Sequence, residues 1–191
     1  MTRWKVAIDA GHGGHDNGSE TLELKEKDLT LEIALGIEKH LKLISTDIDV
    51  LMVRKEDIFI KPEERARIAS DGFSDFLVSV HINSTPEATK ASGYETLINS
   101  SLNNFHFLYQ AYHNQIMNFL KTINIRDRGV KQNDKLILLR EFGSLCLLTE
   151  NLFIDHPEDA ALLKDKKFKD QLSQAHANAI VDFFERRAQI D

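Results

Sequence analysis

Three apolar segments of the chain each end in a residue that can bind a metal ion or transfer a proton. Residues 6–11 lead to His12, residues 76–80 to His81, and residues 145–149 to Glu150. Segments of this length, rich in Val, Ile and Leu and without a helical period, are typical of strands buried on both faces of a parallel sheet. Ligands of such sheets bind outside the carboxyl ends of the strands. Two imidazoles and one carboxylate are therefore expected to converge there, which favours metal-assisted hydrolysis.

Each of these residues also has a simpler interpretation. His12 lies in Gly11-His12-Gly13-Gly14, where a phosphate-binding loop is the alternative, although the glycine spacing fits neither a P-loop nor a dinucleotide-binding loop. His81 could be a hydrogen-bonded residue at a strand end. Glu150 follows the most apolar segment, where an unpaired charge is costly. We therefore expect a cation near Glu150, or a raised pKa that suits general acid–base catalysis.

A third metal ligand has to come from another part of the chain. Four acidic residues crowd the segment after the His12 loop, namely Glu20, Glu23, Glu26 and Asp28. Such a charged segment is usually solvated surface, and position alone does not choose among the four.

The other elements that must position these residues alternate between strand and helix patterns. Further strands are predicted at residues 48–53, 93–98 and 135–139. Helices are predicted from about residue 28 to 41, at 62–70, at 104–122, from 157, and at 168–184. This alternation predicts an α/β fold, with a mostly parallel sheet and helices on both faces. Without a linker or repeat, residues 1–191 are expected to form one catalytic domain.

Composition and charge exclude several classes of partner. The net charge is −6 and Lys and Arg do not cluster, so nucleic acid is not an expected partner. The longest apolar segments are strand-sized, well below the roughly 20 residues of a membrane helix, so no membrane partner is expected. Met1-Thr2-Arg3-Trp4 leads directly into the first strand, which leaves no room for a signal peptide. The lone Cys146 is expected to be a small core residue.

Several motifs occur in a characteristic order along the chain. They are Ile8-Asp9-Ala10-Gly11-His12-Gly13-Gly14, Lys25-Glu26-Lys27-Asp28, Ser79-Val80-His81-Ile82-Asn83-Ser84, and Glu150 with Phe153-Ile154. Together they resemble the zinc-dependent N-acetylmuramoyl-L-alanine amidases of the Amidase_3 type. Arg54 with Asp57, and Asp127-Arg128-Gly129-Val130, are similar to further landmarks of that family.

The resemblance implies a site, a fold and a substrate. It implies one Zn²⁺ per chain held by His12, Glu26 and His81, with Glu150 as the catalytic acid and base. It also implies a mixed six-stranded sheet. The substrate would be peptidoglycan, cut at the amide between N-acetylmuramic acid and L-alanine. Asn83 and Arg54 are candidate substrate-binding residues.

Some positions depart from the family pattern, and some alternatives stay open. Ile82 stands where alanine is common and Leu152 where glycine is common, which puts the cleft shape in question. Two histidines and a carboxylate also occur in non-haem iron oxygenases, but those usually have double-sheet β folds. A second enzyme alternative keeps the zinc and changes the substrate, as a peptidase or a deacylase would. A different class is a non-catalytic wall-binding or regulatory protein with an amidase fold.

The expected biology follows from the same features. With no signal peptide, we expect a monomer made in the cytoplasm that acts on the cell wall after release, either as a phage endolysin or as a bacterial autolysin.

Overall fold

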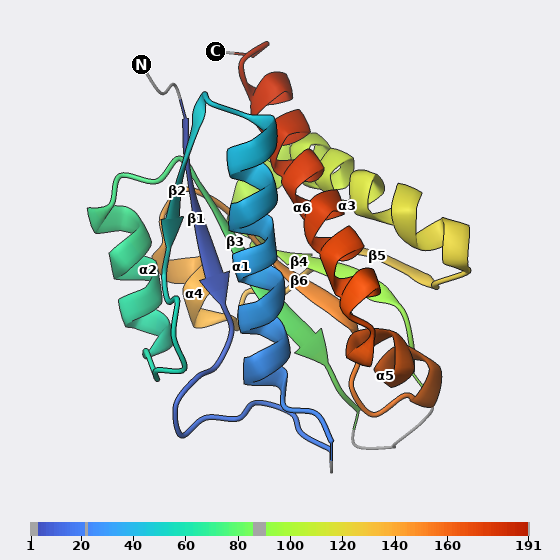
Figure 1. The fold of residues 1–191 in the computed structure, drawn as a ribbon. Coiled ribbons are helices and arrows are strands. Elements are labelled where there is room, and N and C mark those ends of the chain that lie inside the picture. Colours follow the sequence, from blue (N-terminus) through green and yellow to red (C-terminus); the bar gives the residue numbers. More distant parts are fainter. Residues whose placement is uncertain (1–3, 22, 86–90, 191) are drawn as a thin grey trace.

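The computed structural model describes residues 4–21, 23–85 and 91–190, and their centre is a six-stranded sheet (Figure 1). The strand order is β2-β1-β3-β6-β4-β5. The strands are β1 (Trp4–Ala10), β2 (Ile48–Met52), β3 (Phe76–Asn83), β4 (Tyr94–Ile98), β5 (Asp127–Gln132) and β6 (Leu145–Phe153). Every neighbouring pair is parallel except β4 and β6, which are antiparallel. The predicted mixed, mostly parallel sheet is confirmed.

Helices cover both faces of the sheet, but unequally (Figure 1). The long helices α1 (Glu26–Ile44), α3 (His106–Leu120) and α6 (Lys166–Arg187) pack on one face. The shorter helices α2 (Pro62–Asp71) and α4 (Ile137–Glu141) pack on the other. Helix α5 (Pro157–Lys164) links β6 to α6, and short 3-10 turns η1 (Ser100–Phe105) and η2 (Lys121–Ile123) flank α3.

Alternation along the central strands explains the two layers, because successive side chains point to opposite faces. On β3, Phe76 and Val78 join the core under α1, α3 and α6. Leu77 joins Cys146 and Leu148 in the smaller core under α2 and α4. Cys146 is fully buried, as expected of a core residue.

One predicted strand is wrong. Residues 135–139 do not form a strand; they lead into and begin α4, whose Leu138 and Leu139 pack against Cys146 and Leu148. A short apolar run fits a buried strand and a buried helical turn equally well. The sixth strand is instead β5, whose sequence Asp127-Arg128-Gly129-Val130-Lys131-Gln132 is mostly polar because it forms the edge of the sheet.

The ladder between β3 and β6 is irregular near its carboxyl end. His81 pairs with Glu150, but the register then shifts so that Asn83 pairs with Phe153. Inside this bulge the buried Leu152 has φ of 71°, a left-handed conformation that favours glycine. The glycine that the family commonly has here is therefore explained by the backbone. Bulges of this kind redirect side chains beside active sites.

No helix within the described part of the chain is long and apolar enough to cross a membrane.

Candidate active site

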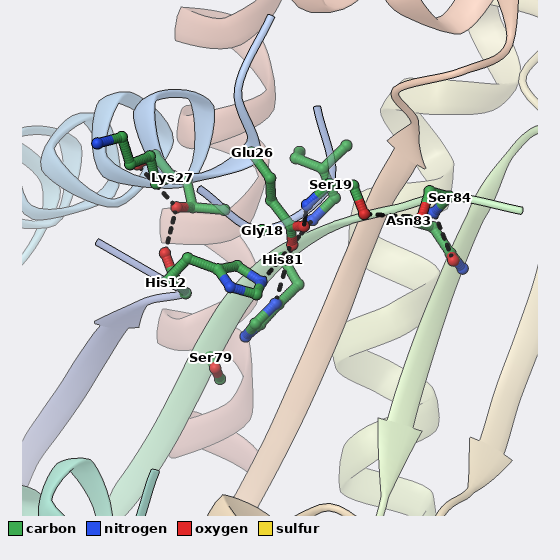
Figure 2. Close-up of polar contacts among 12 residues, drawn as sticks. His12, Gly18, Ser19, Glu26, Lys27, Ser79, His81, Asn83 and Ser84 are labelled. Atoms are coloured by element: carbon green, nitrogen blue, oxygen red, sulfur yellow. Dashed lines mark hydrogen bonds and ion pairs between the residues drawn. The ribbon is translucent and has the colours of Figure 1, made fainter. Parts of the chain in front are cut away.

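The structure brings together three potential metal ligands that are distant in the sequence (Figure 2). His12 follows β1, His81 lies near the end of β3, and Glu26 is the first residue of α1. One potential ligand atom from each residue lies within 4.8 Å of the others. Glu150 is the β6 register partner of His81, so it lies at the same edge of the sheet. The predicted convergence at the strand ends is therefore present.

The Glu26 carboxylate is the centre of this group. Its Oε1 accepts hydrogen bonds from His81 Nδ1 and from the Ile82 backbone N–H, both at 3.0 Å, and lies 3.1 Å from His12 Nε2. Its Oε2 accepts from the Ser19 backbone N–H at 2.9 Å. Burial opposes ionisation, but the bonds from His12 and His81 outweigh it and lower the pKa of Glu26 far below its usual range. Glu26 is thus held as an anion.

The His12 ring is oriented by a residue that the sequence analysis did not single out. His12 Nδ1 lies 2.9 Å from Asp16 Oδ2, and Asp16 Oδ1 accepts from the Gly18 N–H at 3.0 Å. Burial disfavours a charged ring, but Glu26 and Asp16 together raise the pKa of His12. A carboxylate on the far nitrogen of a metal-binding histidine fixes its tautomer and ring orientation. The sequence did contain a signal for this contact, because Asp16 lies four residues after His12 in a turn-forming segment.

Two glycines allow the chain to pass close to the imidazole rings. A Cβ at Gly11 would lie 2.4 Å from the His81 ring, and a Cβ at Gly18 would lie 2.7 Å from the His12 ring. Gly18 also has φ of 64°, which disfavours other residues. Glycine is therefore required at both positions by close approach to the site.

Arg65 fixes the position of the His12 loop by an ion pair and a hydrogen bond. It is buried, and its Nη1 donates to Asp9 Oδ1 at 2.8 Å while its Nη2 donates to the His12 carbonyl at 2.5 Å. Ser79 Oγ donates to the other oxygen of Asp9 at 2.7 Å. The ion pair thus fixes the backbone that carries His12.

Arg54 is placed differently from the substrate-binding residue expected from the sequence. Its side chain is buried, and its guanidinium donates to the carbonyls of Ala10, Gly11, Lys27 and Glu56 at 2.8–3.0 Å. These bonds tie the end of β1 to the start of α1. The geometry supports a role in positioning the loops, and it gives no support to direct substrate contact by Arg54.

Glu150 has surroundings opposite to those of Glu26. Its Oε2 is buried and has no hydrogen-bond partner among the described residues. Burial first, and then the nearby charges of Glu26 and Glu95, raise the pKa of Glu150 well above its usual value. A carboxyl of this kind is suited to carry a proton. The raised pKa expected from the sequence is present.

An open cleft is lined by the three potential ligands and Glu150, and its lining also includes Asp16, Asn83 and Ser84. Asn83 Nδ2 donates to Glu95 Oε1 at 3.1 Å, and the Asn83 Oδ1 accepts from the Ser84 N–H at 2.8 Å. Asn83 therefore lines the cleft, and its role in substrate binding stays a prediction.

A buried polar chain supports the strand that carries Glu150. Asn151 Nδ2 donates to the His81 carbonyl at 3.1 Å, and its Oδ1 accepts from His176 Nε2 at 2.8 Å. Tyr112 OH donates to His176 Nδ1 at 2.7 Å. Burial lowers the pKa of His176 to about 3, so this ring is neutral. Helices α3 and α6 are thereby bonded to the strands of the site.

Two imidazoles and a carboxylate with ligand atoms within 4.8 Å of one another, beside a carboxyl of raised pKa in an open cleft, are arranged as in metal-dependent hydrolases. The comparison with known proteins identifies the family within that class. The model of the N-acetylmuramoyl-L-alanine amidase family (Amidase_3) matches residues 6–182, and the chain belongs to this family. The enzyme class predicted from the sequence is confirmed.

Individual relatives agree with this assignment. The chain is 37% identical over 180 residues to the endolysin of Bacillus phage SPP1, covering 93% of this chain and 65% of the endolysin. It is 34% identical over 181 residues to the sporulation-specific N-acetylmuramoyl-L-alanine amidase of Bacillus subtilis (strain 168), covering 94% of this chain and 68% of that protein. The crystal structure of an N-acetylmuramoyl-L-alanine amidase from Clostridium difficile 630 superposes with a TM-score of 0.90 at 30% identity, covering 97% and 98% of the two chains. The chain thus spans about two thirds of the length of these curated relatives.

Proposed function

We propose that this chain hydrolyses the amide bond between N-acetylmuramic acid and L-alanine in peptidoglycan, with one zinc ion held by His12, Glu26 and His81. Membership of the amidase family supports the bond that is cut. The observation that carries the site assignment is the division between an ionised Glu26 inside the donor set and an unpartnered Glu150 beside it.

The residues present fit a zinc ion. Two imidazole nitrogens and one carboxylate oxygen, all within 4.8 Å of one another, form the usual protein ligand set of a catalytic zinc site, which keeps one position open. Asp16 supplies the outer carboxylate that such sites use to orient a histidine. When bound, zinc supplies Lewis-acid activation of the scissile carbonyl and of water.

The protein's own groups would then handle the proton. We assign Glu150 as the base that takes a proton from the attacking water and the acid that returns it to the leaving amine of L-alanine. Its buried, unpartnered Oε2 and raised pKa suit both tasks. Asn83, at the edge of the cleft, is assigned to hold the substrate near Glu150. The step is a direct transfer of the lactyl acyl group to water.

The bond can be identified by digesting purified peptidoglycan and analysing the products by mass spectrometry. The expected products are free stem peptides with L-alanine amino termini, and intact glycan strands. New reducing ends would indicate a glycosidase. New amino groups on diaminopimelate or D-alanine alone would indicate a peptidase. Glu150→Gln, assayed on the same substrate, controls for contaminating hydrolases.

The setting of the reaction is also part of this proposal. We assign residues 1–191 to one monomeric catalytic domain, and its action to the cell wall after release as an endolysin or autolysin. Size-exclusion chromatography with light scattering tests the monomer. Lysis of intact cells from outside, compared with purified walls, tests whether the domain reaches its substrate unaided.

A further inference from the structure

Two basic side chains on β5 share one buried carboxylate near the cleft. Arg128 Nε and Lys131 Nζ each donate to Glu95 Oε2 at 2.6 Å. The three side chains together carry one net positive charge. The Lys131 side chain is 44% exposed and that of Arg128 is 21% exposed, whereas Glu95 is buried. The two cationic groups are therefore accessible to solvent, whereas the Glu95 carboxylate that they share is not.

This basic pair is connected to the catalytic carboxyl through the sheet. Glu95 is the β4 register partner of Glu150, and its Oε1 accepts from Asn83 Nδ2 at 3.1 Å. Arg128 also lies over the Phe153 ring, 4.8 Å from its centroid. Going along the sheet from His81, one passes Glu150, then Glu95, then the basic pair.

On the side of the candidate site away from β5, the surface is mainly apolar. A cavity of about 280 Å³ opens between the start of α2 and the start of α4. Its walls include Phe59, Ile60, Pro62, Leu136 and Ile137, and it shares His12 and His81 with the cleft. Lys135 also lines this cavity, and Arg65 and Asp9 within it neutralise each other. The cavity is thus mainly apolar.

We propose that this asymmetry sets the direction in which the substrate lies, with an acidic stem peptide running toward Arg128 and Lys131 and the uncharged muramoyl side in the apolar cavity. This inference rests on the proposed function and adds a specificity to it. The ligand of the basic pair is the free α-carboxylate of a D-glutamate that follows L-alanine.

The distances are compatible with this assignment. Two strand spacings separate β6 from β5, about 9.6 Å. Two extended peptide residues span about 7 Å, so a carboxylate on the second residue of the stem lies within reach of long side chains from β5. The reverse direction would place that anion in the mainly apolar cavity, where Lys135 is the cation that could pair with it and Asp16 would repel it. The β5 site offers two cations, Arg128 and Lys131.

The inference can be tested with two soluble substrates that differ in one group. These are N-acetylmuramoyl-L-alanyl-D-glutamate and N-acetylmuramoyl-L-alanyl-D-isoglutamine, in which the α-carboxylate is an amide. The zinc-loaded wild-type protein should prefer the acid by about tenfold in kcat/KM, mainly through KM, because hydrogen bonds between charged groups contribute more than neutral ones. Lys131→Gln should bring the preference close to one while cleavage of the amide substrate persists. Lys131→Arg should keep most of the preference.

Two further variants make the result specific. Lys39→Gln, a matched substitution at a lysine on α1 paired with Asp170, should leave the ratio unchanged. If Lys135→Gln removes the preference and Lys131→Gln does not, the direction is reversed and the inference is wrong. Equal rates on both substrates in the wild-type protein would also overturn it. If neither substrate is cleaved, and walls are not cleaved either, the proposed function itself fails.

Discussion

Glu26 and Glu150 are the same type of residue in the same cleft, and burial disfavours the charged form of both, yet their polar neighbours differ. Glu26 is reached by two imidazoles and two backbone N–H groups, and its pKa is lowered. Glu150 has one buried oxygen without a partner among the described residues, and its pKa is raised. One carboxyl is therefore fixed as an anion and the other is ready to exchange a proton.

The difference teaches that neighbours, and not residue type, assign the two roles. A carboxylate that accepts several hydrogen bonds is stabilised in its charged form, and a desolvated one near other anions is not. Pairs of titratable groups whose pKa values are pushed apart are a common mark of acid–base assignments in active sites. This contrast supports the proposed roles of Glu26 as the metal ligand and Glu150 as the proton carrier.

The largest effect is expected from Glu26→Gln. The substitution removes the negative charge from the proposed ligand set of His12, Glu26 and His81, so zinc should be lost and wall lysis with it. Metal analysis and a turbidity assay on the same preparation check both. Treatment of the wild-type protein with a chelator should also remove zinc and abolish wall lysis, and added zinc should restore the lysis by the wild-type protein. A fully active, metal-free wild-type protein would contradict the metal assignment.

Glu150→Gln should separate catalysis from metal binding. Activity should fall by about 10²–10⁴-fold, the usual contribution of general acid–base catalysis. The zinc content should stay near one per chain, because His12, Glu26 and His81 are unchanged. If the Gln variant loses zinc, Glu150 is a metal ligand and its assignment as the proton carrier is wrong.

Asp16→Asn should have an intermediate effect, because it acts through His12. Loss of the outer carboxylate of a metal-bound histidine typically costs 10–100-fold in metal affinity or activity. Competition with a chromogenic chelator measures the affinity. Excess zinc should rescue most of the activity, which a purely structural defect would not allow. Asp71→Asn, at an exposed carboxylate that pairs with Arg67 at the end of α2, is the matched control.

The smallest effect concerns stability and pH in the metal-free protein. Because the folded pKa of Glu150 is raised, the folded state binds more protons than the unfolded state above the usual glutamate pKa of about 4.3. The contribution of Glu150 to the free energy of unfolding is therefore lost as the pH rises from the usual glutamate pKa toward the raised pKa of the folded state. Urea titrations at pH 5 and pH 8 should show that Glu150→Gln gains stability relative to wild type at the higher pH. If the difference in free energy of unfolding between Glu150→Gln and the wild type is the same at pH 5 and pH 8, Glu150 ionises normally.

Much of the site could be predicted because strand ends carry their own signal. His12, His81 and Glu150 each follow a buried apolar segment, and the sheet brings those ends together. Glu26 had no such signal, since four acidic residues crowd its region and only the family resemblance distinguished it. Its role depends on the loop that folds Ser19 and α1 back onto the strand ends, which is a tertiary feature.

The sequence did not correctly predict strand β5 or helix α4, although it did predict the other edge strand, β2. Strand β5 is polar because one of its sides faces solvent, so it lacks the pattern of a buried strand. Residues 136–139 have that apolar pattern but lie outside the sheet. Leu138 and Leu139 are part of helix α4 and pack in the smaller core. Asp16 was not singled out because its function depends on a single contact with His12.

Gly11 and Gly18 have a consequence for how the protein tolerates change. Neither residue has a side chain that could bind a metal, yet a methyl group at either position would overlap an imidazole ring. In a saturation mutagenesis screen, these two glycines should be as intolerant as the histidines that they contact. A designer who wished to fit a larger ion or a different ligand would have to move this backbone before changing any ligand.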